Sequence, residues 1–210
     1  MTFRLWLATV AALICGSQAD AQNKVRTETI RPSVTANPAG KPNANATPSD
    51  AHNAAGVPDI VTDLSQLPAP VARTRERILA AAQSGDLQKL LTIMQMNETM
   101  PIFSFSDEKD PVAFWKNSYP DSEGIEVLSI LVTLLQTGYV HVDKGTPQEM
   151  YLWPYFTRMP VKNLTPEQKV ELFRIITGND YKDMLDFGAY IFYRVGIVPD
   201  GTWHFFVAGN

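Results

Sequence analysis

The aromatic residues of this chain lie almost entirely in its last two thirds, and this distribution decides which part can fold. Residues 71–210 hold all seven tyrosines, nine of the ten phenylalanines and three of the four tryptophans. A stable core requires large apolar side chains, because their burial offsets the loss of conformational entropy on folding. We therefore expect residues 71–210 to form a single globular domain with an ample core.

The preceding segment, residues 22–70, has the opposite composition. It contains seven of the fifteen prolines, many Ala, Asn, Ser and Thr residues, and no Phe, Trp or Tyr. Such a composition predicts a disordered or extended tether, because too little apolar area is available for burial. Two stretches within the tether, Val57–Val61 and Leu64–Leu67, are more apolar and can dock on the domain surface as an arm.

Residues 1–21 have the three parts of a secretory signal peptide. Arg4 supplies the positive start, and the apolar stretch Leu5–Cys15 is shorter than the roughly 20 residues that span a bilayer. Small residues then offer two cleavage sites, one before Asp20 and a preferred one before Gln22. The sequence thus predicts a periplasmic or secreted protein.

The single cysteine leaves a second outcome open. Bacterial lipoproteins are cut directly before a cysteine, which is then acylated, but Leu13 and Ile14 are bulkier than the small residues that usually precede such a site. Cleavage before Gln22 instead removes Cys15 with the leader. The mature protein would then have no disulfide, no thiol nucleophile and no thiolate metal site.

Charge and motifs narrow the class of partner. Residues 71–210 carry seventeen acidic and thirteen basic side chains, a net charge of −4, whereas nucleic acid would require a basic patch. No nucleophile elbow, glycine-rich phosphate loop or zinc-binding helix motif is present, so we expect no metal and no cofactor. The expected partner is an envelope protein or a small ligand, and not nucleic acid. We expect no transmembrane helix in this chain, and its oligomeric state stays open.

Apolar periodicity and capping residues predict the helices. The segment Glu123–Gln136 is apolar nearly all round and is predicted to be the central buried helix. Thr165, followed by a proline and by Gln168, has the pattern of a capping box. The predicted helices cover residues 71–82, 87–96, 111–115, 123–136, 165–176 and 180–187.

Four strands complete the prediction. Residues 139–144 and 149–156 form one pair, in which Pro154 indicates that the second strand lies at an edge or breaks there. Residues 190–198 and 202–208 form a hairpin around Pro199-Asp200-Gly201. The predicted fold is α+β, an antiparallel four-stranded sheet packed against a helical N-terminal half, with a helical insertion between the two strand pairs.

Two resemblances accompany these patterns. The segment Ile78–Leu87, with its Ser-Gly-Asp joint, resembles the first helices of NTF2-like domains, which implies a curved sheet covered by helices and an aromatic-lined pocket. The segments Tyr151–Phe156, Phe187–Tyr190 and Asp200–Phe206 are similar to uncharacterised secreted proteins of proteobacteria. No activity comes with the second resemblance.

His141 and Asp143 are the weak candidates for catalysis. Their spacing of two places both on one face of a strand, where the carboxylate can orient the imidazole for general base chemistry. In the alternative interpretation Tyr139, His141 and Asp143 form the solvent-facing side of the strand, while Val140 and Val142 point inward. The alternative is the more common arrangement.

The weak candidates for ligand binding are aromatic residues and one arginine. Trp153 and Tyr155 are expected to share one strand face, as are Trp203 and Phe205, and such rings either bind a planar ligand or form the core of the sheet. Arg194 stands in an otherwise apolar strand. It either reaches solvent or pairs with a buried acid, or it binds a ligand carboxylate.

These features favour an exported binding or interaction module without enzymatic activity. One alternative is a small NTF2-like hydrolase or lyase that uses His141 and Asp143 with Arg194 as an anion holder. This enzyme requires the three side chains to converge on one cavity. The other alternative is an envelope scaffold anchored by a lipid on Cys15.

The mature N-terminus distinguishes the two processing outcomes. We expect intact-mass spectrometry of the exported protein to show an unmodified chain beginning at Gln22, or at Asp20 if the earlier site is used. A chain that begins with an acylated Cys15 would contradict this prediction and support the lipid-anchored scaffold.

Overall fold

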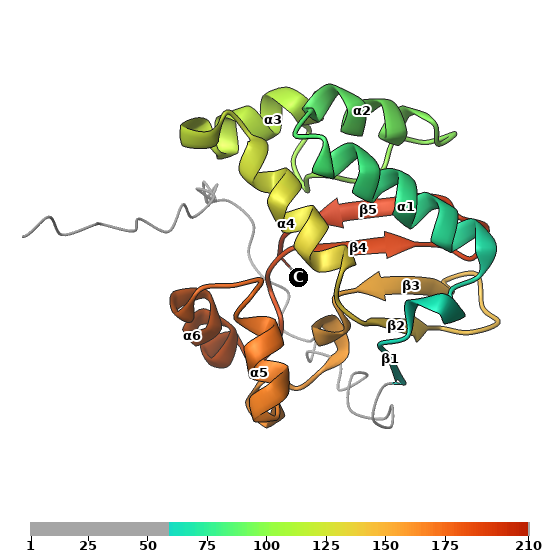
Figure 1. Cartoon of the computed structure of the whole chain (residues 1–210). Coiled ribbons are helices and arrows are strands. Elements are labelled where there is room, and N and C mark those ends of the chain that lie inside the picture. Colours follow the sequence, from blue (N-terminus) through green and yellow to red (C-terminus); the bar gives the residue numbers. More distant parts are fainter. Residues whose placement is uncertain (1–58, 210) are drawn as a thin grey trace, which may run out of the picture. The chain divides into compact units, whose positions relative to one another are not determined.

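The computed structural model describes residues 59–209 (Figure 1). The predicted signal peptide, Cys15 and residues 22–58 of the predicted tether lie outside the described residues. The described residues form six α-helices and five β-strands, and the predicted α+β class is confirmed.

Capping side chains set the start of several helices. Asp86 accepts hydrogen bonds from the backbone N–H groups of Gln88 and Lys89, and Thr165 forms the predicted capping box with Gln168. The helix after Thr165 ends four residues earlier than predicted. The helices are α1 (Ala69–Gln83), α2 (Leu87–Gln95), α3 (Pro111–Ser118), α4 (Ile125–Leu135), α5 (Pro166–Leu172) and α6 (Gly178–Phe187).

The sheet has five strands where four were predicted. They are β1 (Ile60–Val61), β2 (Tyr139–Val142), β3 (Met150–Trp153), β4 (Arg194–Ile197) and β5 (Trp203–Val207), and each pairs antiparallel with the next. The additional strand β1 belongs to the apolar stretch near the end of the predicted tether. Its two residues pair with Tyr139 and Val140 of β2, so the arm docks by extending the sheet.

Both faces of the sheet are buried. Successive side chains of a strand point to opposite faces, and each set packs in its own apolar cluster. Tyr139, Tyr151 and Trp153 lie in one apolar cluster, whereas Val140 and Leu152 lie in a second cluster on the other face. The alternative interpretation, in which Tyr139, His141 and Asp143 face solvent, is wrong for Tyr139, which is only 2% exposed. Asp143 is exposed and His141 is partly exposed, as that interpretation expects.

Two groups of helices cover the two faces. Buried side chains of α1, α2, α3 and α4 belong to the first cluster, and α4 contributes Val127, Leu128, Leu131, Leu134 and Leu135. Leu172 of α5 and Met184 of α6 belong to the second cluster. Figure 1 shows α1 and α4 across one side of the sheet, and the pair α5 and α6, which the chain inserts between β3 and β4, away from them. The predicted helical insertion is present.

A β-bulge in β5 changes which side chains share a face. Ile197 pairs with Trp203 and Gly196 pairs with Phe205, so His204 is an extra residue in β5. Trp203 and Phe206 consequently lie in the first cluster, whereas Phe205 packs against the second. Trp203 and Phe205 were predicted to share a face, and this prediction is wrong because the bulge shifts the alternation.

Within residues 59–209 no helix is long and apolar enough to cross a bilayer.

Gly201, in the β4–β5 turn, gives a test of how closely this turn approaches α1. Its φ is +93°, and a Cβ atom there would lie 2.8 Å from the backbone oxygen of Pro70. Gly145 in the β2–β3 turn also has positive φ, +76°, but a Cβ atom there meets nothing within 4 Å.

We expect Gly145→Ala to lower the free energy of unfolding by about 1 kcal/mol, because the left-handed backbone conformation is the only source of strain there. Gly201→Ala should lower the free energy of unfolding by roughly 2 kcal/mol more than Gly145→Ala does, since the backbone of Pro70 must also move. Urea denaturation followed by circular dichroism measures both values. Equal losses for the two variants would contradict the close approach.

Candidate functional site

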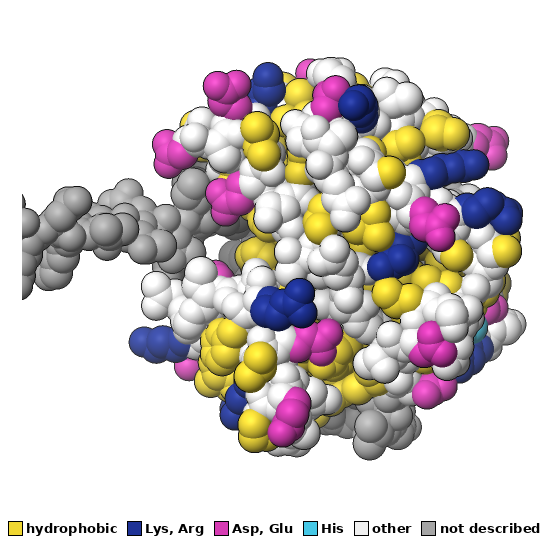
Figure 2. Space-filling model, in the orientation of Figure 1, with side chains coloured by type: hydrophobic (Ala, Val, Ile, Leu, Met, Phe, Trp, Pro, Cys, Tyr) yellow, Lys and Arg dark blue, Asp and Glu magenta, His cyan; other side chains and the backbone are white. Residues whose placement is uncertain are grey.

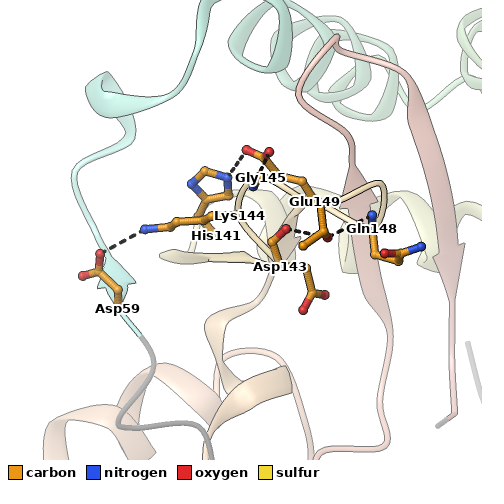
Figure 3. A network of polar contacts seen from close by, with 8 residues as sticks. Asp59, His141, Asp143, Lys144, Gly145, Gln148 and Glu149 are labelled. Atoms are coloured by element: carbon orange, nitrogen blue, oxygen red, sulfur yellow. Dashed lines mark hydrogen bonds and ion pairs between the residues drawn. The ribbon is translucent and has the colours of Figure 1, made fainter.

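The predicted pair of His141 and Asp143 does not form. The Nε2 atom of His141 lies 2.7 Å from Oε1 of Glu149, which comes from the far side of the β2–β3 hairpin (Figure 3). Asp143 has φ of +53°, so the strand alternation ends at Val142 and the Asp143 carboxylate points away from the imidazole. The prediction of this pair is wrong because β2 ends at Val142, two residues before the predicted end of the strand at Lys144.

The pair of His141 and Glu149 fastens the hairpin. The imidazole stacks on the ring of Tyr151, its direct neighbour on β3, with centroids 4.1 Å apart. The second carboxylate oxygen of Glu149 accepts a hydrogen bond of 2.9 Å from the backbone N–H of Gly145. Both oxygens of Glu149 thus bind groups of the same hairpin, and this arrangement is structural.

The same turn also contacts the first strand. The Nζ atom of Lys144 lies 3.5 Å from a carboxylate oxygen of Asp59, directly before β1 (Figure 3). Both side chains are mostly exposed, so this ion pair contributes little to stability.

Arg194 and His141 lie on opposite faces of the sheet. Val195 and Ile197 point into the first cluster, so Arg194 points to the other face of β4, whereas His141 lies on the face of Tyr139 and Tyr151. Burial, and then the nearby charge of Arg158, lowers the pKa of Arg194. His141, Asp143 and Arg194 therefore do not converge on one cavity.

The candidate aromatic residues lie in the core. Trp153 and Trp203 are 0% and 1% exposed, so neither ring is open to a ligand from solvent. Tyr155 follows Pro154, where the chain leaves β3 for a 3-10 helix, and packs in the second cluster. Trp153 and Tyr155 do not share a face, because the strand ends between them.

A groove of about 350 Å³ lies elsewhere, at one end of the helix pair α1 and α2. The two helices are joined by the short link Ser84–Asp86, which places the start of α1 beside the end of α2. The turn between β4 and β5 closes the third side. The residues that line the groove come from the segments 70–77, 93–98 and 200–203. A smaller hollow of about 240 Å³ lies next to the start of α2 and is lined partly by its capping residue Asp86.

Hydrogen bonds between the three segments fix the walls of the groove. Thr74 donates to the backbone oxygen of Gly201 at 2.6 Å. Asn97 accepts from the backbone N–H of Trp203 and donates to its carbonyl oxygen, both at 3.3 Å. Asp200 accepts from the N–H of Thr202 at 2.8 Å, which orders the turn itself.

Charged side chains of both signs line the groove. Arg73 and Arg77 project from α1 one helical turn apart, while Glu98 follows α2 and Asp200 belongs to the turn. All four are exposed. Within residues 59–209 none of them forms an ion pair at 4.0 Å or less. Figure 2 shows basic side chains gathered on the surface over α1.

The sequence contained only an indirect signal for this groove. The arginines appear in it as the polar face of an amphipathic helix, which is the ordinary explanation for such residues. Asp200 appears as a turn residue. Nothing in the local pattern shows that residues about 125 positions apart meet across one opening.

The described residues include no cluster suited to a metal ion. No group of three or more His, Cys, Asp or Glu side chains within residues 59–209 is arranged to hold one.

Comparison with protein-family models, curated proteins and solved structures found no match to this chain. The resemblances to NTF2-like domains and to secreted proteins of proteobacteria therefore stay predictions.

The hairpin network gives a prediction on pH. The hydrogen bond from Gly145, and then that from His141, lowers the pKa of Glu149 below its ordinary value of 4.5. A carboxyl with a lowered pKa in the folded state stabilises the fold above its unfolded pKa, and this contribution is lost as the pH falls through the folded pKa.

We expect Glu149→Gln to be less stable than the wild type at pH 7, and the difference to shrink as the pH is lowered from about 5 to 3. Urea denaturation at a series of pH values measures it. Gln148→Ala, an exposed change in the same turn, is the control. A stability difference that stays constant down to pH 3 would show that Glu149 contributes by another route.

Proposed function

We propose that this protein is an exported binding module that holds a small polar ligand in the groove between α1, the end of α2 and the β4–β5 turn. In this proposal the leader delivers it to the periplasm or the medium, the Pro/Ala/Asn-rich segment before β1 is its tether, and it performs no chemistry on the ligand. The observation that carries the proposal is the groove itself, whose three walls are joined by hydrogen bonds.

The volume and the rigidity of the groove both support this function. Small-molecule sites have volumes of roughly 300 to 1,000 Å³, and the groove lies within this range. Walls that are already tied together lose little conformational entropy when a ligand binds. Thr74 and Asn97 provide these ties before any ligand is present.

The geometry favours this function over the enzymatic alternative. A hydrolase or lyase that uses His141, Asp143 and Arg194 requires the three side chains at one site, and they lie apart. Neither His141 nor Arg194 lines the groove. The lipid-anchored scaffold depends on Cys15, which lies outside the described residues, so it stays an alternative that the mature N-terminus tests.

Two methionines in one segment allow a matched test. Met96 lines the groove and is 59% exposed, whereas Met100 is 37% exposed and does not line it. A tryptophan at position 96 should occupy the groove without disturbing the core, while a tryptophan at position 100 adds the same bulk outside it.

We expect a screen of amino acids, short peptides, dicarboxylates, sugars and nucleosides to include compounds that shift the NMR signals of the Asn97 side-chain amide and the Gly201 amide in the mature protein. Met96→Trp should weaken this binding at least about tenfold, because filling the site displaces the ligand, and Met100→Trp should leave it unchanged. The proposal fails if no compound shifts these signals, or if Met96→Trp binds as the wild type does.

A further inference from the structure

The charges of the groove are divided between its walls. Arg73 and Arg77 both project from α1, and the carboxylates of Glu98 and Asp200 come from the other two segments. Neither Arg73 nor Arg77 reaches either carboxylate within 4.0 Å among the described residues. The groove therefore keeps two positive and two negative charges apart across an opening.

The two arginines suit a carboxylate. Side chains four residues apart are neighbours on one helix face, so both guanidinium groups can reach the same anion. Arginine binds carboxylates with two parallel hydrogen bonds, which gives geometric selectivity as well as attraction. A carboxylate on this wall would also relieve the repulsion between Arg73 and Arg77.

The opposite walls suit an ammonium group. Glu98 and Asp200 present carboxylate oxygens, and only one oxygen of Asp200 has a hydrogen bond within the described residues, from Thr202. The formal charge of the lining is zero, since two arginines face two acids. A simple anion would be attracted to one wall and repelled by the others, whereas a molecule with both charges complements all of them.

The remaining lining adds shape and hydrogen-bonding groups. Ile93, Met96 and Pro70 give apolar contact between the charged walls, and the hydroxyl of Thr202 can bond a peptide group. A chain of two or three residues is roughly 7 to 11 Å long when extended. A peptide of this length carries an amine at one end and a carboxylate at the other.

We propose that the groove binds short zwitterionic peptides, with the carboxylate on Arg73 and Arg77 and the ammonium group near Glu98 and Asp200. This inference rests on the proposed function, because it names the ligand class of the same groove. Recognition of both termini selects against longer chains, whose ends are too far apart.

The first test uses trialanine and two blocked forms of it with the mature protein at low ionic strength. Acetylation removes the ammonium charge, and amidation removes the carboxylate. Isothermal titration calorimetry should show trialanine binding, and each blocked form should bind at least about tenfold more weakly, because one set of charge-assisted hydrogen bonds is lost.

Paired variants assign each terminus to its wall. The double variant Arg73→Gln/Arg77→Gln should bind trialanine more weakly than the wild type does. It should bind trialanine and its amide with equal affinity, since the partner of the carboxylate is gone. Glu98→Gln/Asp200→Asn should do the same for trialanine and its acetylated form, and the amide oxygen that the second change introduces keeps an acceptor for the Thr202 N–H. Arg174→Gln, an exposed arginine just after α5, is the matched control and should bind as the wild type does.

Four results would overturn the inference. Equal affinity for trialanine and both blocked forms would show that the charges do not read the termini, and tighter binding of succinate or inorganic phosphate than of trialanine would assign the arginines to simple anions. If trialanine fails to bind while another compound binds the wild type and loses its affinity in the Met96→Trp variant, only the peptide assignment falls. If no compound binds the groove, the proposed function falls as well.

Discussion

Burial of the sheet on both faces is the constraint on which the rest of this domain depends. The aromatic side chains of Tyr139, Tyr151 and Trp153 pack under α1 and α4, and the aliphatic side chains between them need their own cover. The chain supplies that cover as α5 and α6, inserted between β3 and β4. A sheet with no open face offers no platform for a ligand, so a binding site has to form at the rim, where helix ends and turns meet.

The rim groove follows from how α1 is oriented. Arg75 donates two hydrogen bonds, of 2.9 and 2.7 Å, to the backbone oxygen of Leu135 at the end of α4. Successive residues of a helix are about 100° apart, so residues two positions before and after Arg75 point well away from α4. Arg73 and Arg77 are therefore directed to the groove by the same packing that buries Val71 and Ile78 in the core.

Local sequence signals predicted most of the fold because caps, turns and apolar periodicity act over a few residues. The helix starts at Asp86 and Thr165 and the turn at Asp200-Gly201 are of this kind. The errors arise where a tertiary contact decides. The strand β1 has only two residues and exists because β2 is there to pair with it, and the bulge at His204 reverses the alternation for the rest of β5.

The candidate site could not be found in this way, because its chemistry consists of charges that are kept apart. Exposed arginines and acids on flexible segments would approach one another, since pairing costs little beyond side-chain entropy. Here α1 is held by Arg75, the turn is held by Thr74 and the end of α2 is held by Asn97. Each of these bonds joins segments that are far apart in the sequence. The separation of charge that would recognise a ligand is thus a property of the folded framework, and no local pattern of residues contains it.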